Sequence, residues 1–227
     1  MMIRHNVDFM EETTMFKGFF DLDGPFNRFG TFAFDMIALN LLWFIFSIPI
    51  FTVGASTTAL FYVLGKKIRN EDGYIWRDFW KSFKLNFRQS TIIWLLMLIV
   101  FSIARFNLNS SHLFGSMGKA LVVFQYAILL QMIFISIYIF PLLSRFYLTI
   151  AGAIKMAFFV ANRHLLTTII CILLFVATLF ITWVASIFIF VAVSLYAISA
   201  AYFIEKILVK YMPEKEGSSL EETASEE

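Results

Sequence analysis

Long apolar runs, separated by short charged segments, dominate this chain. Six of them predict membrane-spanning helices: one at about residues 31–48, a shorter second one that follows a reversal at Pro49–Gly54 and ends near Gly65, then 91–103, 120–143 and two within 165–204. The stretch 165–204 carries no formal charge, and as one helix it would be about 60 Å long, twice the hydrocarbon thickness of a bilayer. We therefore predict two helices there, with a turn near Trp183–Ser186. The expected fold is an all-α polytopic transmembrane bundle with six spans.

A strongly charged segment, residues 66–90, lies between the second and third predicted spans. Helical spacing places five aromatic residues on one face of it: Trp76, Phe79, Trp80, Phe83 and Phe87. The same spacing gives a neighbouring basic row: Arg77, Lys81, Lys84 and Arg88. We predict an amphipathic cytosolic helix here. Such a helix suits the membrane surface or a groove on a partner protein, and the pattern leaves both alternatives open for residues 74–88.

The composition supports a membrane location. Of 227 residues, 60% are hydrophobic and only 15% are charged, against about 25% charged in an average soluble domain. The N-terminal segment has several acidic residues and no compact apolar core, so we expect no cleavable signal peptide. The single cysteine, Cys171, excludes a disulfide framework.

The basic residues also predict the topology. With both termini in the cytosol, only Arg105 and Lys119 of the 18 basic residues lie outside, which is a strong positive-inside bias. We expect a multi-pass plasma-membrane protein with three parts: a cytosolic or interfacial segment 1–30, one membrane domain 31–206, and a disordered acidic tail 207–227. Residues 105–119 are expected to form a loop. Residues 145–163 either continue the fourth span or lie along the interface.

Several polar or small residues lie inside the first two predicted spans. Asp35 and Asn40 are in the first, and Asp35 is placed to reach water, Arg28 or a neighbouring helix. Intramembrane acids are costly and often functional, so a structural role and a ligand or ion role both stay open. The second span carries the small or hydroxyl residues Gly54, Ser56, Thr57 and Thr58. They favour close helix packing, with a solute path as the alternative.

The chain shows no motif of a known catalytic, cofactor or metal site. Its three histidines, His5, His112 and His164, fall in different segments of the predicted topology and cannot share a metal ion. We therefore expect no enzymatic activity and no cofactor. We also expect no nucleic-acid partner, because the basic segment is interleaved with aromatic residues and flanked by spans. The lipid bilayer is the expected environment.

Residues 24–95 carry a series of ordered features that resembles the YesL family, bacterial membrane proteins built on a domain of unknown function. The features include Asn40-Leu41-Leu42-Trp43, Gly54-Ala55-Ser56-Thr57-Thr58-Ala59, Glu71-Asp72-Gly73, Phe79-Trp80-Lys81-Ser82-Phe83-Lys84 and, later in the chain, Ser144-Arg145-Phe146. The resemblance implies an accessory membrane protein associated with carbohydrate uptake by ABC transporters.

The Glu71-Asp72-Gly73 element followed by a short helix is also similar to the coupling loop of ABC sugar-transporter permeases. On this basis the expected partners are ABC permease or ATPase subunits, contacted through the aromatic and basic rows. The leading hypothesis is a non-enzymatic accessory or regulatory component of a carbohydrate ABC system. The alternative is a small-solute transporter or channel acting alone, with a path past Asp35, Asn40 and residues 56–58.

Overall fold

The computed structural model describes residues 25–71, 73–111 and 115–211, and in these ranges every regular element is helical. In chain order the elements are α2 (Pro25–Ser47), η1 (Ile50–Thr52), α3 (Val53–Ile68), α4 (Ile75–Ser110), α5 (Gly115–Arg145), α6 (Ile150–Arg163), α7 (Leu165–Val184), η3 (Ser186–Phe190), α8 (Ala192–Leu208) and η4 (Val209–Tyr211). The predictions for residues 1–24 and 212–227 lie outside the described residues. The all-α prediction is confirmed for the described part of the chain.

Helix α3 forms the centre of the fold. It packs against α2, α4, α5 and α8, and ten of its side chains or glycines are buried. It approaches α4 closely at Gly54, where an added Cβ atom would lie 2.5 Å from the Ser90 carbonyl oxygen and 2.8 Å from the Trp94 Cβ. The absent side chain at Gly54 therefore permits this contact, as small residues do between membrane helices.

Among the described residues, five helical segments are long and apolar enough to cross a membrane: Phe29–Ser47, Ile75–Ser110, Gly118–Arg145, Leu165–Val184 and Ala192–Tyr211. The one predicted span that is missing from this set is the second, which corresponds to α3. With 16 residues it is about 24 Å long, shorter than the roughly 30 Å hydrocarbon core. The multi-pass character is thus supported, whereas the count of six is not confirmed.

Helix α4 is one continuous helix of 36 residues, and this corrects two boundaries. The amphipathic segment is not a separate element, because it runs directly into the third span. Residues 105–110, predicted as loop, complete α4, and α5 begins at Gly115. The reason is that no glycine or proline interrupts the sequence between Ile75 and Ser110, so nothing breaks the helix.

After α5 the chain forms the short helix α6 and then the pair α7 and α8. Residues 145–163, for which two alternatives were open, separate from the fourth span, because α5 ends at Arg145 and α6 starts after Thr149. The Thr149 side chain accepts a hydrogen bond from the Gly152 N–H at 3.1 Å and so caps α6. The predicted turn after Trp183 is confirmed, since α7 ends at Val184 and η3 leads into α8.

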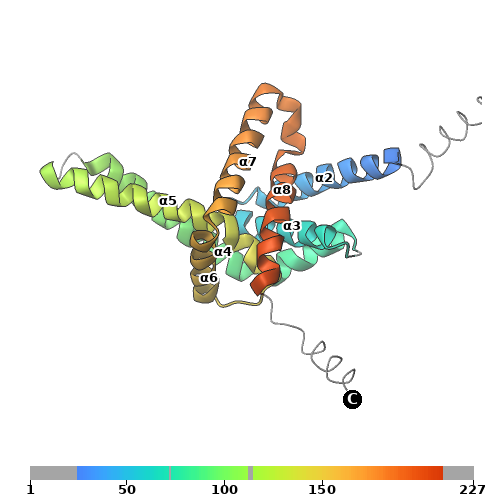
Figure 1. Cartoon of the computed structure of the whole chain (residues 1–227), viewed down its shortest axis with the longest axis horizontal. Helices are drawn as coiled ribbons and strands as arrows, with labels where there is room; N and C mark the ends of the chain where they lie inside the picture. The colour runs from blue at the N-terminus through green and yellow to red at the C-terminus, as the bar shows by residue number, and fades with distance from the viewer. Residues whose placement is uncertain (1–24, 72, 112–114, 212–227) are drawn as a thin grey trace, which may run out of the picture.

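The helices do not form a set of parallel rods. In Figure 1 the far part of the α4–α5 pair projects to the left, and the far part of the α7–α8 pair projects upwards. Both pairs diverge from the region around α3. Their outer surfaces are rich in exposed leucine, isoleucine, valine and phenylalanine side chains, which are suited to contact with lipid.

Candidate functional site

Charged residues from five helices meet near the end of α3, and we call this group the ionic cluster. Its members are Asp35, Lys66, Lys67, Arg69, Glu71, Asp78, Arg145 and Glu205. The Lys66 ammonium donates to the Asp78 carboxylate at 2.8 Å, and Lys67 pairs with Asp35. Asp35 thus has a cationic partner on the neighbouring helix, one of the possibilities that the sequence had left open.

Arg69 lies between α3 and α4 and forms ion pairs with Glu71 in the same loop and with Glu205 in α8. Its Nε and Nη2 atoms donate to the two carboxylate oxygens of Glu71 at 2.6 and 3.2 Å, and its Nη1 pairs with the buried Glu205. The hydrogen bond from Arg69 holds the pKa of the Glu71 carboxyl below its usual range, against the opposing effect of burial. Arg145 at the end of α5 lies 3.9 Å from Glu205 and 4.0 Å from Glu71. The sequence indicated no pairing between residues so far apart.

The aromatic face of α4 is partly occupied by this chain's own first helix. The ring of Phe46 in α2 lies 5.0 Å from that of Phe83, 5.3 Å from Trp80, 5.6 Å from Phe79 and 6.1 Å from Trp76, measured between ring centroids. These are the spacings of interacting aromatic pairs. Part of the aromatic row that was predicted to contact lipid or a partner therefore packs against α2 instead.

Two aromatic residues of this face stay accessible. Phe79 and Phe83 are buried, whereas Trp76 is 59% and Trp80 36% exposed, and their rings stack on each other at 6.5 Å. Phe87 is partly buried and packs against Phe83 at 5.5 Å. Fewer aromatic residues are thus open to lipid or to a partner than the sequence pattern predicted. Trp76 and Trp80 form the apolar part of the accessible surface.

The predicted basic row is exposed beside these tryptophans. Arg77, Lys81, Lys84 and Arg88 all lie on the surface. The Lys84 ammonium lies 4.6 Å from the centroid of the Trp80 ring, and the Arg77 guanidinium lies 5.2 Å from that of Tyr74, which are cation–π distances. The structure thus brings an accessible aromatic pair and a basic row together at the start of α4. We call Trp76, Trp80 and this basic row the docking face.

Asn40 has a clear structural role. Its side-chain nitrogen donates to the Ile189 carbonyl at 3.0 Å, and its oxygen accepts from the backbone N–H groups of Val193 and Ser194 at 3.1 and 3.4 Å. The residue is almost fully buried. It therefore caps the start of α8 from another helix, in the way that an N-cap residue does within one helix.

The hydroxyl groups of α3 serve packing. Ser56, Thr57 and Thr58 each donate to a backbone carbonyl four residues earlier in the chain, a local bond that needs no ligand. Thr58 also bonds to Ser90 of α4 at 2.9 Å. The packing interpretation of this motif, including Gly54, agrees with the geometry.

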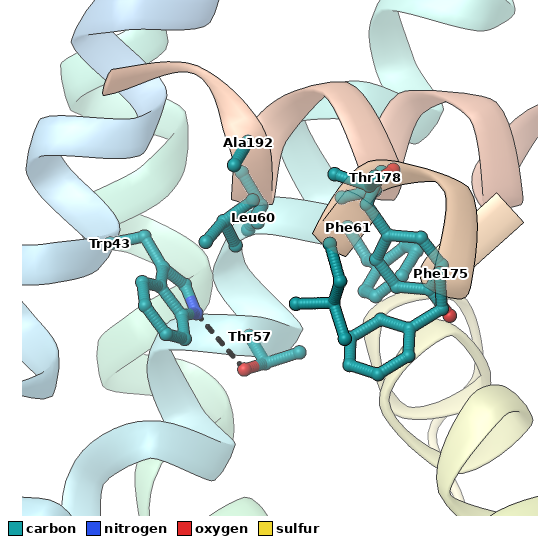
Figure 2. A pocket seen from close by; sticks show the side chains of 11 residues that line it. Trp43, Thr57, Leu60, Phe61, Phe175, Thr178 and Ala192 are labelled. Atoms are coloured by element: carbon teal, nitrogen blue, oxygen red, sulfur yellow. Dashed lines mark hydrogen bonds between the residues drawn. The ribbon is translucent and has the colours of Figure 1, made fainter. Parts of the chain in front are cut away.

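An apolar cavity of about 240 Å³ lies between α2, α3, α7 and α8 (Figure 2). Figure 2 shows the Trp43 indole pointing at Thr57, to which its Nε1 donates a hydrogen bond at 3.1 Å. Of the residues predicted to line a solute path, Thr57 lines this cavity, whereas Asp35, Asn40, Ser56 and Thr58 do not. This cavity therefore does not bring those polar residues together.

Metal-binding side chains do not cluster in the described part of the chain, where no group of three His, Cys, Asp or Glu residues could hold an ion. His5 and His112 lie outside the described residues. The His164 Nε2 lies 3.1 Å from the Tyr211 hydroxyl, and burial, together with Lys210 and Arg163, holds the pKa of His164 below its usual value. The absence of enzymatic activity stays a prediction.

Two comparisons show that the chain is similar to proteins of unknown function. The family profile described as "Protein of unknown function, DUF624" matches residues 36–108, a range that contains α3 and the docking face. The chain is 30% identical over 140 residues to "Uncharacterized protein YesL" of Bacillus subtilis (strain 168), which covers 60% of this chain and 66% of that protein. No solved structure matches the chain.

Proposed function

This chain belongs to the YesL family, and on that premise we propose that it is a non-enzymatic accessory or regulatory component of a bacterial carbohydrate ABC transport system. In this proposal the protein lies in the plasma membrane with both termini in the cytosol. The docking face at the start of α4 binds a permease or ATPase subunit of the importer. The partner class follows from the resemblance to accessory proteins of carbohydrate uptake.

The arrangement of the ionic cluster supports the proposed topology. The residues that it joins come from the first part of α2, the end of α3, the start of α4, the end of α5 and the last part of α8. In a six-span topology with cytosolic termini, all these helix ends lie on the cytosolic side. In this topology α3 crosses as a short helix, surrounded by longer ones that cover most of its surface.

The observation that carries the docking proposal is the exposure of Trp76 and Trp80 beside a basic row. Tryptophan and arginine are enriched among the residues that contribute most to protein–protein binding. The Phe46 ring packs against both tryptophan rings, and the Lys66–Asp78 ion pair joins the start of α4 to α3. A rigid surface loses little conformational entropy on binding, and its positive charge suits an acidic partner surface.

Co-purification from native membranes tests this function. Tagged protein is expected to bring down a permease or ATPase subunit, and the double variant Trp76→Ala, Trp80→Ala is expected to lose it. Phe83 is left in place because it is buried and its loss would disturb packing. The control is Trp183→Ala, an 80% exposed tryptophan at the end of α7, which should retain the partner. Recovery of no transporter subunit by the unaltered protein would refute the proposal.

The alternative of a transporter acting alone has less support from the arrangement of residues. Asp35 is paired with Lys67, and both side-chain polar atoms of Asn40 are bonded to the backbone, the nitrogen to η3 and the oxygen to the start of α8. Flux of labelled solute into proteoliposomes that contain this protein alone would favour the alternative over the accessory role.

A further inference from the structure

A small polar cavity lies where α4 meets the end of α5. Its volume is about 120 Å³, and its polar wall includes Lys81, Ser82, Asn86, Ser144 and Arg145. It thus differs from the cavity of Figure 2, whose wall is almost entirely apolar. Most of the lining comes from two segments, 81–86 and 143–147, which are about 60 residues apart in the chain, and Tyr62 of α3 completes it. Parts of both segments belong to the features by which the sequence resembles the YesL family, Phe79–Lys84 and Ser144–Phe146.

Two cations of different geometry share this cavity. Lys81 is exposed and makes no ion pair or hydrogen bond with another described residue. Arg145 forms ion pairs with Glu205 and Glu71, at 3.9 and 4.0 Å. Within the neighbouring ionic cluster the two arginines balance the two glutamates. Lys81 therefore adds a positive charge that no described acidic residue neutralises.

The wall of the cavity also carries a buried hydroxyl. Ser82 is 1% exposed, and its oxygen accepts a hydrogen bond from Asn86 Nδ2 at 3.2 Å. The same Asn86 nitrogen donates to the Ser82 carbonyl at 3.1 Å, which holds this pair in place. Because Ser82 accepts in this bond, its own proton can be donated to a ligand.

We propose that this cavity binds a phosphate group, held by Lys81, Arg145 and the Ser82 hydroxyl. A phosphate presents several anionic oxygens that can be shared among these donors. The planar guanidinium can donate two parallel hydrogen bonds to it, whereas the ammonium acts as a compact positive charge. The group belongs either to a phospholipid or to a soluble phosphorylated compound, since the chemistry of recognition is the same. The exposed apolar side chains of Leu85 and Tyr147 also line the cavity, so a larger ligand could extend over them.

This proposal goes beyond the accessory function and does not depend on it. Lys81 of the docking face lines this cavity, whereas Trp76 and Trp80 do not, so the Trp76→Ala, Trp80→Ala variant tests docking without altering the cavity wall. The basic row itself provides a matched control. Lys84 lies one turn after Lys81, and its ammonium is placed over the Trp80 ring instead of in the cavity. Non-specific attraction of anions would involve both lysines equally, whereas the proposed site requires Lys81.

Calorimetric titration of the full chain in dodecyl maltoside, a detergent without phosphate, tests the proposal. The probes are inorganic phosphate, glucose 6-phosphate and mixed micelles that contain phosphatidylglycerol. We expect saturable binding of at least one probe, weakened about tenfold or more by Lys81→Gln because a charge-assisted contact is lost. Lys84→Gln should change the Kd less than twofold, and Lys81→Arg should restore most of the affinity.

The pattern of binding distinguishes the two sources of phosphate. Binding of the micelles alone would assign a phospholipid, and binding of glucose 6-phosphate or inorganic phosphate would assign a soluble compound. The proposal is overturned if no probe binds saturably, or if Lys81→Gln and Lys84→Gln weaken binding equally. Because Lys81 is exposed, the variant is expected to keep the thermal unfolding midpoint of the unaltered protein.

Discussion

Asn40 in α2 accepts a hydrogen bond from the backbone N–H of Val193 at 3.1 Å, across 153 positions of the chain. The first described helix thus caps the last long one. This contact joins the start of the membrane domain to the turn between α7 and α8. It explains a polar side chain inside an apolar helix without a ligand.

Replacement of Asn40 by leucine should destabilise the protein by about 2 kcal/mol or more, because it leaves buried backbone groups of η3 and α8 without a partner. Asn40→Asp keeps the acceptor but loses the donor to Ile189, and introduces a buried charge, so it should also destabilise. Thermal unfolding in detergent measures both effects. The control is Ser102→Ala, an exposed hydroxyl bonded within its own helix, which should have little effect. Equal midpoints for Asn40→Leu and the control would contradict the capping role.

Gly54 and Gly30 should respond in opposite ways to alanine. A Cβ at Gly54 would collide with the backbone of Ser90 and with the Trp94 Cβ, whereas a Cβ at Gly30 meets nothing within 4 Å. We expect Gly54→Ala to cost about 1–3 kcal/mol through overpacking. Gly30→Ala should be neutral or stabilising by up to about 1 kcal/mol, because alanine favours the helix. Unfolding midpoints of the two variants check this, and a stable Gly54→Ala protein would argue against close packing of α3 on α4.

The Arg69–Glu71 pair should make stability depend on acidic pH. The folded-state pKa of Glu71 is lowered, so the unfolded chain binds the proton more readily. The stabilisation is therefore present above the unfolded pKa and is lost as the pH falls through the folded value. The unaltered protein should be more stable than Glu71→Gln at pH 7, and the difference should shrink below about pH 4.5. Unfolding midpoints measured from pH 7 to pH 3 check it, and a constant difference would exclude this linkage.

Cysteine labelling can decide whether α3 crosses the membrane. In a Cys171→Ser background, Ile48→Cys lies before α3 and Lys81→Cys after it, and both positions are exposed. If α3 crosses, a membrane-impermeant maleimide should label Ile48→Cys on intact cells and Lys81→Cys only after permeabilisation. Gly30→Cys should behave like Lys81→Cys. Labelling of positions 48 and 81 from the same side would show that α3 does not cross the membrane.

The helix content was predictable from local pattern, whereas the lengths were less so. The turn between α7 and α8 was predicted correctly because 40 uncharged residues exceed one crossing. The loop assigned to residues 105–110 was wrong because polar residues were taken as a helix end although no glycine or proline stops α4. The role of Gly54 was also predictable, since small residues in an apolar helix are a known contact device.

The sequence by itself determined that this chain is a helical membrane protein with its basic residues near one set of helix ends, because hydropathy, helical spacing and charge are local properties. It also placed the aromatic and basic rows on α4. Only the tertiary structure decided that Phe46 covers part of the aromatic face, that Asn40 caps α8, and that Lys81 and Arg145 share one cavity. Each of these contacts depends on the angle and rotation of helices that are distant in the chain, and no local pattern carries that information.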